Sequence, residues 1–276
     1  MEATLPAVVT AVERVSPGFV RVALSVGAEW MSTGAPDEFI HLDVGEATVD
    51  VGDGHTARHY TISRVTPDGV EIEVATHGYG PGAAWAKSAV PGQDVAVSAP
   101  KAYYAAPEAS VPRVLIGDAT ALPAIARILA EASAAERFAV VVELGTMADA
   151  KALPTRAAAR IEWRLGGNGV GPSMLVDAAS SELDACAAEG LTPYLWVACE
   201  SVVSRRIRNL ARVDRGLPTS VLRIVGYWHR DQEKIVTVWS SLTADQRGHY
   251  EAVWREDRSD EENWIEAEPL LMAWGV

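Results

Sequence analysis

Short stretches of alternating hydrophobic and polar residues dominate the chain up to about residue 100. Residues 70–74, Val-Glu-Ile-Glu-Val, show the period at which every second side chain shares one face of a strand. Proline, glycine and aspartate separate six such runs, which are residues 7–15, 19–26, 38–44, 58–62, 70–76 and 94–98. Six short strands joined by turns predict a small antiparallel barrel.

The pattern changes at Pro112. Four runs are interpreted as strands buried on both faces, at 114–117, 138–144, 160–165 and 194–198. Helical periods follow three of them, at 122–132, 174–189 and 201–212. This alternation of strand and helix predicts a parallel sheet with helices on both faces, so the fold class is a β-barrel followed by an α/β domain.

We expect the domain boundary within residues 105–112, where Pro107, Glu108 and Ser110 suit a linker. The predicted units are residues 1–106, 107–226 and a C-terminal tail, 227–276. The tail has helical periods at 243–255 and 261–271 and carries five of the nine tryptophans. A disordered segment rarely holds so many large aromatics, so we expect the tail to pack on the body of the protein.

Composition narrows the possible functions. A length of 276 residues suits two domains, and a net charge of -13 argues against a nucleic-acid partner. Cys186 and Cys199 have no partners at metal spacing, and His55 and His59 enter a strand on which they would not share a face, so we expect no metal site. No apolar run approaches the roughly 20 residues of a membrane span, and no signal-peptide pattern opens the chain. The expectation is a cytoplasmic monomer without membrane insertion.

A first motif, Arg58-His59-Tyr60-Thr61, makes flavin binding the leading hypothesis. It offers a guanidinium for a diphosphate, an aromatic ring for the isoalloxazine and a hydroxyl for its polar edge. In a strand Arg58 and Tyr60 share one face and Thr61 the other, so Thr61 would act through its backbone or through a bulge. An ordinary half-buried strand is the alternative.

A second motif lies one strand later, in residues 77–85, His-Gly-Tyr-Gly-Pro-Gly-Ala-Ala-Trp. Its glycines let the backbone approach a ligand, and Pro81 suits the first position of a helix whose free N–H groups would face phosphate. A tight connection packed by Trp85 is the alternative interpretation.

The second domain offers a nicotinamide site after its first strand, at Gly117-Asp118-Ala119-Thr120-Ala121. Ligands of parallel sheets bind beyond the carboxyl ends of the strands. A structural strand-to-helix turn stays open because the GxGxxG pattern is absent. Residues 166–171 are glycine-rich but lack a P-loop lysine, which favours a flexible connection. Arg205 suits either a 2′-phosphate contact or a solvated helix face.

Taken in order, these segments resemble the siderophore-interacting protein family, FAD-dependent ferric-siderophore reductases of the ferredoxin–NADP reductase superfamily. The resemblance rests on R-x-Y-T at 58–61, the H-G-x-G-P loop, Gly117-Asp118 with 120–123, Ala198-x-Glu200 and Gly226-Tyr227-Trp228. It implies an FAD barrel, an NAD(P)H domain and a tail folded back over the flavin. The predicted cofactor-binding residues are Arg58, Tyr60, Thr61, Ser63, His77, Gly78, Gly80, Pro81, Gly82, Ala83, Trp85, Asp118, Thr120, Ala121, Glu200, Arg205, Tyr227 and Trp228.

The chain departs from the family pattern at several positions. Ser63, Ala83, Ala119, Cys199 and His229 stand where the family usually has arginine, serine, glutamate, glycine and arginine. The histidine-glycine loop is also one residue shorter. These changes leave FAD binding in place, because backbone groups supply much of it, and they bear mainly on the acceptor and on the choice between NADH and NADPH.

The resemblance implies electron transfer from NAD(P)H through FAD to a ferric siderophore, with no protein acid or base required. A general NAD(P)H:flavin or quinone reductase, and a non-catalytic siderophore- or FAD-binding protein, are the alternatives. An anionic substrate needs a local basic surface on so acidic a chain. We expect that basic rim to consist of Arg64, Lys101, His229 and Arg230. The alternative is that these four residues are solvated surface residues that do not lie together.

Overall fold

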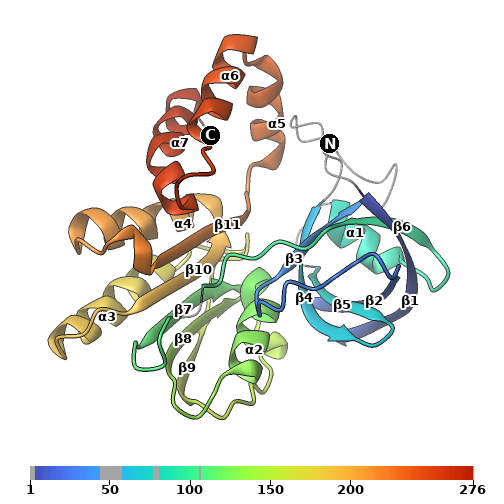
Figure 1. Ribbon diagram of the computed structural model, residues 1–276, viewed down its shortest axis with the longest axis horizontal. Coiled ribbons are helices and arrows are strands. Elements are labelled where there is room, and N and C mark those ends of the chain that lie inside the picture. The colour runs from blue at the N-terminus through green and yellow to red at the C-terminus, as the bar shows by residue number, and fades with distance from the viewer. Residues whose placement is uncertain (1–3, 44–57, 77–80, 106, 276) are drawn as a thin grey trace.

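The computed structural model describes residues 4–43, 58–76, 81–105 and 107–275. Its N-terminal part is a closed antiparallel barrel with the strand order β1-β2-β5-β4-β3-β6, which confirms the barrel predicted from the alternating runs (Figure 1). Helix α1 (Pro81–Ser88) connects the last two strands. The strands are β1 (Thr4–Ser16), β2 (Phe19–Val26), β3 (Phe39–Asp43), β4 (Arg58–Thr66), β5 (Gly69–Ala75) and β6 (Asp94–Ser98).

The second domain is a parallel sheet with the strand order β11-β10-β7-β8-β9. Helix α2 (Leu122–Glu131) packs on one face, while α3 (Leu175–Ala188) and α4 (Ser201–Asn209) pack on the other. The predicted sheet with helices on both faces is therefore confirmed. The strands are β7 (Arg113–Asp118), β8 (Arg137–Leu144), β9 (Ala158–Leu165), β10 (Tyr194–Glu200) and β11 (Leu222–Trp228).

Two elements of this domain differ from the sequence prediction. β11 is a fifth strand, parallel to β10, that the apolar pattern did not reveal. Arg223 interrupts the apolar run of β11. A charged residue is tolerated there because its guanidinium donates to the Tyr103 carbonyl at 3.1 Å. The helix expected over 201–212 is α-helical only to Asn209 and continues as a π-helical turn over Leu210–Asp214.

The C-terminal tail forms three helices, α5 (Gln232–Ser241), α6 (Ala244–Val253) and α7 (Asp260–Trp274), of which α5 was not predicted. Capping boxes begin α6 at Thr243 and α7 at Ser259. Glu261 of α7 accepts the Ile224 N–H at 2.5 Å, which joins the tail to β11 and confirms that the tail packs on the body. No helix among the described residues has the length and hydrophobicity to cross a bilayer.

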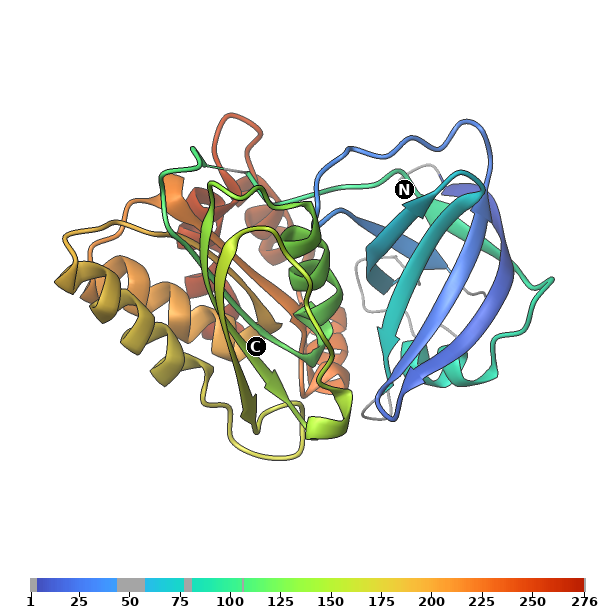
Figure 2. The same cartoon turned by 90° about the horizontal axis from the view of Figure 1, so that it is seen from below.

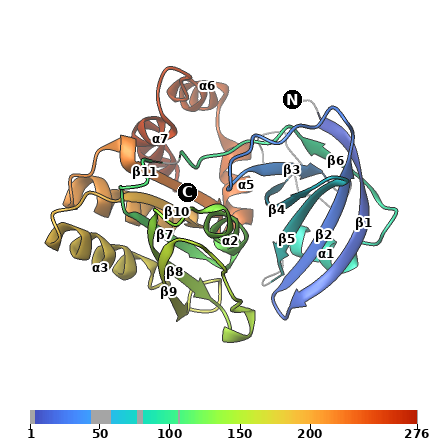
Figure 3. The same ribbon diagram turned by 60° about the horizontal axis from the view of Figure 1, so that its bottom comes forward.

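The barrel and the sheet domain lie side by side, with α2 facing the barrel (Figures 2 and 3). Phe19 of β2 is buried in the core that α2 forms with the sheet. The connection after β8 also contacts the barrel, where Asp149 accepts the Ser16 hydroxyl at 2.6 Å and the Gly18 N–H at 2.7 Å. These contacts fix how the motifs of the two domains face each other.

Candidate functional site

Tyr60 of β4 and Gly82 at the start of α1 come together as the two barrel motifs predicted. The Tyr60 hydroxyl lies so close to Gly82 that a Cβ at this position would stand 1.8 Å from its oxygen. The first turn of α1 carries no acidic residue of its own, which favours an anionic ligand at its N–H groups. A glycine-bounded helix N-terminus beside an aromatic ring suits a flavin diphosphate and its ring. The barrel residues therefore fit FAD.

Other residues of these motifs are placed less directly. Trp85 is buried in the barrel core under Tyr60, with ring centroids 6.5 Å apart, and Ala83 is also buried. Arg58 begins β4, but the direction of its side chain lies outside the described structure, as does that of Pro81. His77, Gly78 and Gly80 lie outside the described residues.

Thr61 lies on the face of β4 opposite Tyr60, as the strand period required. The bulge in this strand comes later, between Ile62 and Arg64, so it does not reverse Thr61. Thr61 is buried toward Tyr227 of β11. Burial and the nearby Asp37 carboxyl raise the pKa of Tyr227. The Thr61 hydroxyl opposes this rise, although the two hydroxyls do not meet in regular hydrogen-bond geometry.

Aromatic rings that the motif analysis missed extend this face of the barrel. The His59 ring lies 4.0 Å from His41 and 5.2 Å from Phe39, and Phe39 stacks on Tyr103 at 5.2 Å. Burial, with the nearby carboxylates of Asp260 and Asp37, raises the pKa of Tyr103 to about 12. These rings lie together because β3 pairs with β4, with Phe39 opposite Thr61 and His41 opposite His59. The sequence alone does not give this strand register.

Asp118 joins the carboxyl ends of three strands. Its Oδ1 accepts the Thr120 N–H at 2.9 Å and the Thr120 hydroxyl at 2.6 Å. Its Oδ2 accepts the Glu200 N–H at 3.0 Å and the Trp228 indole N–H at 2.7 Å. Asp118, Thr120 and Glu200, predicted to border the nicotinamide, are thus brought together with Trp228, and Ala121 is buried in the turn that follows Asp118. The structural role of this turn does not exclude a ligand.

A cavity of about 290 Å³ opens beside Asp118, at the carboxyl ends of the strands. Glu143, Glu200, Trp228 and Arg230 contribute to its lining. Glu200 caps α4, because its Oε2 accepts the N–H groups of Val202 and Val203 at 2.8 and 3.1 Å. This is the position at which parallel sheets bind nucleotides, between strands whose connections run in opposite directions.

Two further residues of this cavity were not among the predicted site residues. Glu143, at the end of β8, is buried and accepts the Met174 N–H at 2.6 Å. Burial raises the pKa of Glu143, and this N–H opposes the rise. Cys199 also lines the cavity, and burial raises the pKa of its thiol well above the ordinary range, which disfavours a reactive thiolate.

The glycine-rich loop at 166–171 is held in place rather than being the flexible connection that the sequence favoured. Asn168 is buried, with a positive φ of 52°, and its Oδ1 accepts the Ala119 N–H at 3.1 Å. Its Nδ2 donates to the carbonyls of Glu143 at 3.0 Å and Gly166 at 2.9 Å. The Asn168 side chain fixes the loop beside the cavity, and the sequence motifs of phosphate-binding loops do not include such a residue.

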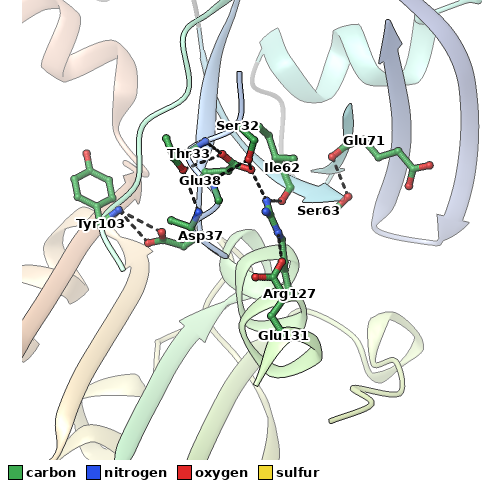
Figure 4. Close-up of polar contacts among 12 residues, drawn as sticks. Ser32, Thr33, Asp37, Glu38, Ile62, Ser63, Glu71, Tyr103, Arg127 and Glu131 are labelled. Carbon is green, nitrogen blue, oxygen red and sulfur yellow. Dashed lines mark hydrogen bonds and ion pairs between the residues drawn. The ribbon is translucent and has the colours of Figure 1, made fainter. Parts of the chain in front are cut away.

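Buried polar contacts join the barrel to the sheet domain near the candidate flavin motif (Figure 4). Arg127 of α2 donates to the Glu38 carboxylate at 2.9 Å and to the Ile62 carbonyl of β4 at 3.2 Å. Asp37 accepts the Trp196 indole N–H at 3.1 Å. Ser63, predicted as a cofactor residue, donates to the Glu71 carbonyl at 3.1 Å on the neighbouring strand.

The predicted basic rim is spread over separate elements. Arg64 is paired with Glu71 near the hairpin that joins β4 to β5, and Lys101 pairs through its backbone with Phe39. Arg230 borders the cavity and donates to the Gly171 carbonyl at 3.2 Å. His229 lies between this cavity and a second one of about 280 Å³, which Arg205 and Lys234 also line. Burial lowers the pKa of His229, so it is a neutral member of this group near pH 7.

Family models match most of the two domains. The model described as siderophore-interacting FAD-binding domain matches residues 46–104, and the model described as siderophore-interacting protein matches residues 112–231. No curated protein matches the sequence.

Solved structures share the whole two-domain arrangement. A siderophore utilization protein from T. fusca is 27% identical, with 83% of this chain and 94% of that chain covered and a TM-score of 0.65. A siderophore-interacting protein from Acinetobacter baumannii is 22% identical, with 91% and 96% covered and a TM-score of 0.68. A ferredoxin reductase in carbazole 1,9a-dioxygenase is 16% identical, with 82% and 70% covered and a TM-score of 0.62, which shows the fold alone.

Proposed function

Because the chain belongs to the siderophore-interacting protein family, we propose that this flavin oxidoreductase passes electrons from NADH or NADPH through FAD to a ferric siderophore. The observation that carries the proposal is the close contact of the Tyr60 hydroxyl with Gly82 at the N-terminus of α1. It unites the two flavin motifs at a helix end without acidic residues. We further propose residues 1–106 as the FAD unit, 107–226 as the NAD(P)H unit and 227–276 as the tail of a cytoplasmic monomer.

On this proposal, the residues of the barrel bind and orient FAD. Tyr60 would face the ring system, the α1 N–H groups beginning at Gly82 would face the diphosphate, and Thr61 would face the domain interface. When bound, FAD supplies the conversion of a two-electron hydride transfer into single-electron transfers. The protein contributes position and exclusion of water, which the buried Thr61 and the buried hydroxyl oxygen of half-buried Tyr227 support.

The carboxyl ends of the sheet would bind the dinucleotide. Asp118 holds Thr120, Glu200 and Trp228 in one network, and the cavity beside it opens toward Arg230. A rigid network of this kind positions a ligand without a flexible loop. No residue is assigned an acid or base role, because hydride and electron transfer to iron require none.

The acceptor is tested by anaerobic turnover of purified, FAD-loaded protein. With NADH or NADPH in excess, a ferric siderophore should be reduced faster than a quinone or free flavin at equal concentration. Equal rates with the quinone would favour the general reductase. A bound flavin that neither nucleotide reduces would favour the non-catalytic binding protein, and protein that takes up no FAD would overturn the proposal.

Replacing Gly82 by alanine should weaken FAD binding by at least about tenfold, a change of about 1.4 kcal/mol. The added Cβ would stand 1.8 Å from the Tyr60 hydroxyl oxygen, so this side chain and the start of α1 cannot both keep their places. The dissociation constant of FAD, measured by fluorescence during titration of apoprotein, checks this. Gly27→Ala is the control, because no atom lies within 4 Å of its added Cβ. An unchanged FAD affinity in G82A would contradict the assignment.

The KM for an anionic ferric siderophore should rise with ionic strength while kcat changes little, because salt screens attraction between partly exposed charges. Replacing Lys101 and Arg230 together by alanine should lower kcat/KM at low salt. Replacing Arg137 and Arg212 by alanine removes the same charge away from the cavity lining and serves as the control. Equal kcat/KM in both double variants would remove the basic rim from the proposal while leaving the flavin assignment intact.

A further inference from the structure

The N-terminus of α3 borders the candidate dinucleotide cavity, and a carboxylate of the protein lies against it. Glu143 ends β8, and its Oε1 accepts the N–H of Met174, the N-cap residue of α3, at 2.6 Å. α3 is 14 residues long, and the N–H groups at the beginning of such a helix favour an anion. One N–H donor that a ligand phosphate could use at this helix end is therefore taken by Glu143.

The second carboxylate oxygen of Glu143 has no donor to offset its negative charge beside the N-terminus of α3. Glu143 is only 1% exposed, and its Oε2 is buried without a hydrogen-bond partner. Gly167 lies directly against this oxygen, since a Cβ there would stand 1.9 Å from it. Among the residues that the structure describes, no lysine or arginine forms an ion pair with Glu143. The nearby Arg164 guanidinium favours the charged form of Glu143 but pairs with Glu162, so a phosphate brought here would meet a like charge.

The strand register places Glu143 where dinucleotide selectivity is decided in doubly wound sheets. Glu143 on β8 is directly opposite Asp118 on β7, and both line the cavity of about 290 Å³. In this type of sheet, an acidic residue beyond the second strand pairs with the free hydroxyls of an adenosine ribose, whereas a 2′-phosphate needs a cation. Arg206 and Arg230 also line the cavity, and they would attract the diphosphate that both dinucleotides share.

We propose that Glu143 is a specificity-determining residue that makes this protein use NADH and exclude NADPH. By accepting the Met174 N–H at the beginning of α3, Glu143 removes one N–H donor, and its charge repels the 2′-phosphate. The inference rests on the proposed function, because it concerns the nucleotide that the reductase would oxidise.

Calorimetric titration of the FAD-loaded protein with NAD⁺ and NADP⁺ tests this independently of turnover. The wild type should bind NAD⁺ at least about tenfold more tightly than NADP⁺. Glu143→Gln keeps the shape of the side chain and removes its charge, so it should reduce that ratio about tenfold. Glu189→Gln removes an exposed carboxylate at the C-terminal end of α3, outside the cavity lining, and should leave the ratio unchanged.

A measurement on the unmodified protein keeps the test valid even where E143Q does not fold. Adenosine 5′-monophosphate should bind at least about tenfold more tightly than adenosine 2′,5′-bisphosphate. Equal or tighter binding of the 2′-phosphorylated ligands, or an unchanged ratio in folded E143Q, would overturn this inference and leave the proposed reductase standing. Failure of the protein to bind any of these nucleotides would overturn both.

Discussion

Replacing Arg208 by alanine is expected to lower the free energy of unfolding by about 3–5 kcal/mol and to release the C-terminal tail. Arg208 of α4 is buried and donates to Glu261 of α7 at 2.7 Å, and it also contacts Glu268 and the Ile224 carbonyl. Its guanidinium carbon lies 5.3 Å from the centre of the Trp264 ring. Truncation would leave buried carboxylates uncompensated where α7 meets the sheet.

Urea denaturation gives the stability change, and limited proteolysis reports whether the tail is released. Arg215→Ala is the matched control, because the ion pair of Arg215 with Asp184 is largely exposed and should contribute at most about 1 kcal/mol. Equal destabilisation by the two substitutions would show that the buried cluster does not anchor the tail.

The barrel and the parallel sheet could be predicted because their local patterns agree with their surroundings in the fold. Alternating runs became the barrel strands, and the runs after Pro112 became β7, β8, β9 and β10 of the second sheet. β9 is a half-buried edge strand and not the buried strand that was expected over 160–165. The missed elements lie at an edge. β11 carries Arg223, whose guanidinium reaches the carbonyl of Tyr103 in the connection between the domains, and α5 lies in a segment without a clear period. A partner distant in the sequence explains Arg223 of β11, and α5 has no clear period, so a local pattern could reveal neither element.

The candidate site was predictable only where one segment carries the chemistry. The contact of Tyr60 with Gly82 and the turn at Asp118 follow from short motifs, whose residues meet as expected. Glu143 and Asn168 gave no such signal, because a glutamate at the end of a strand and an asparagine in a glycine-rich loop are common residues. Their roles depend on the register of β8 with β7 and on contacts between distant segments. Arg127 also gave no signal, because the helical pattern shows it only as a polar position and not as the partner of Glu38.

Replacing Arg127 by methionine is expected to destabilise the protein by about 3–5 kcal/mol at neutral pH and to loosen the barrel against α2. The Glu38 carboxylate is fully buried and receives a hydrogen bond from Arg127 across the domain interface at 2.9 Å. Methionine would keep much of the side-chain volume while leaving this buried charge without its cation. Urea denaturation followed by tryptophan fluorescence measures the change.

The destabilisation should shrink as the pH falls. Burial opposes ionisation of Glu38, but hydrogen bonds from Ser32, Arg127 and Thr33 outweigh it and hold its pKa below the ordinary value. Such a group stabilises the fold above its unfolded pKa and loses this contribution as the pH falls through its lowered folded pKa. In R127M the pKa of Glu38 should move upward, so protonation relieves the buried charge at mildly acidic pH.

Glu131→Gln provides the control for this prediction. Glu131 pairs with the same guanidinium at 2.7 Å but is 47% exposed, so its loss should cost only about 0.5 kcal/mol, with little pH dependence of the difference from wild type. A destabilisation of R127M that stays constant from neutral to acidic pH would show that Arg127 acts through packing and not through the charge of Glu38. If the stability difference between wild type and R127M becomes smaller at acidic pH, the buried ion pair of Arg127 with Glu38 stabilises the contact between the two domains.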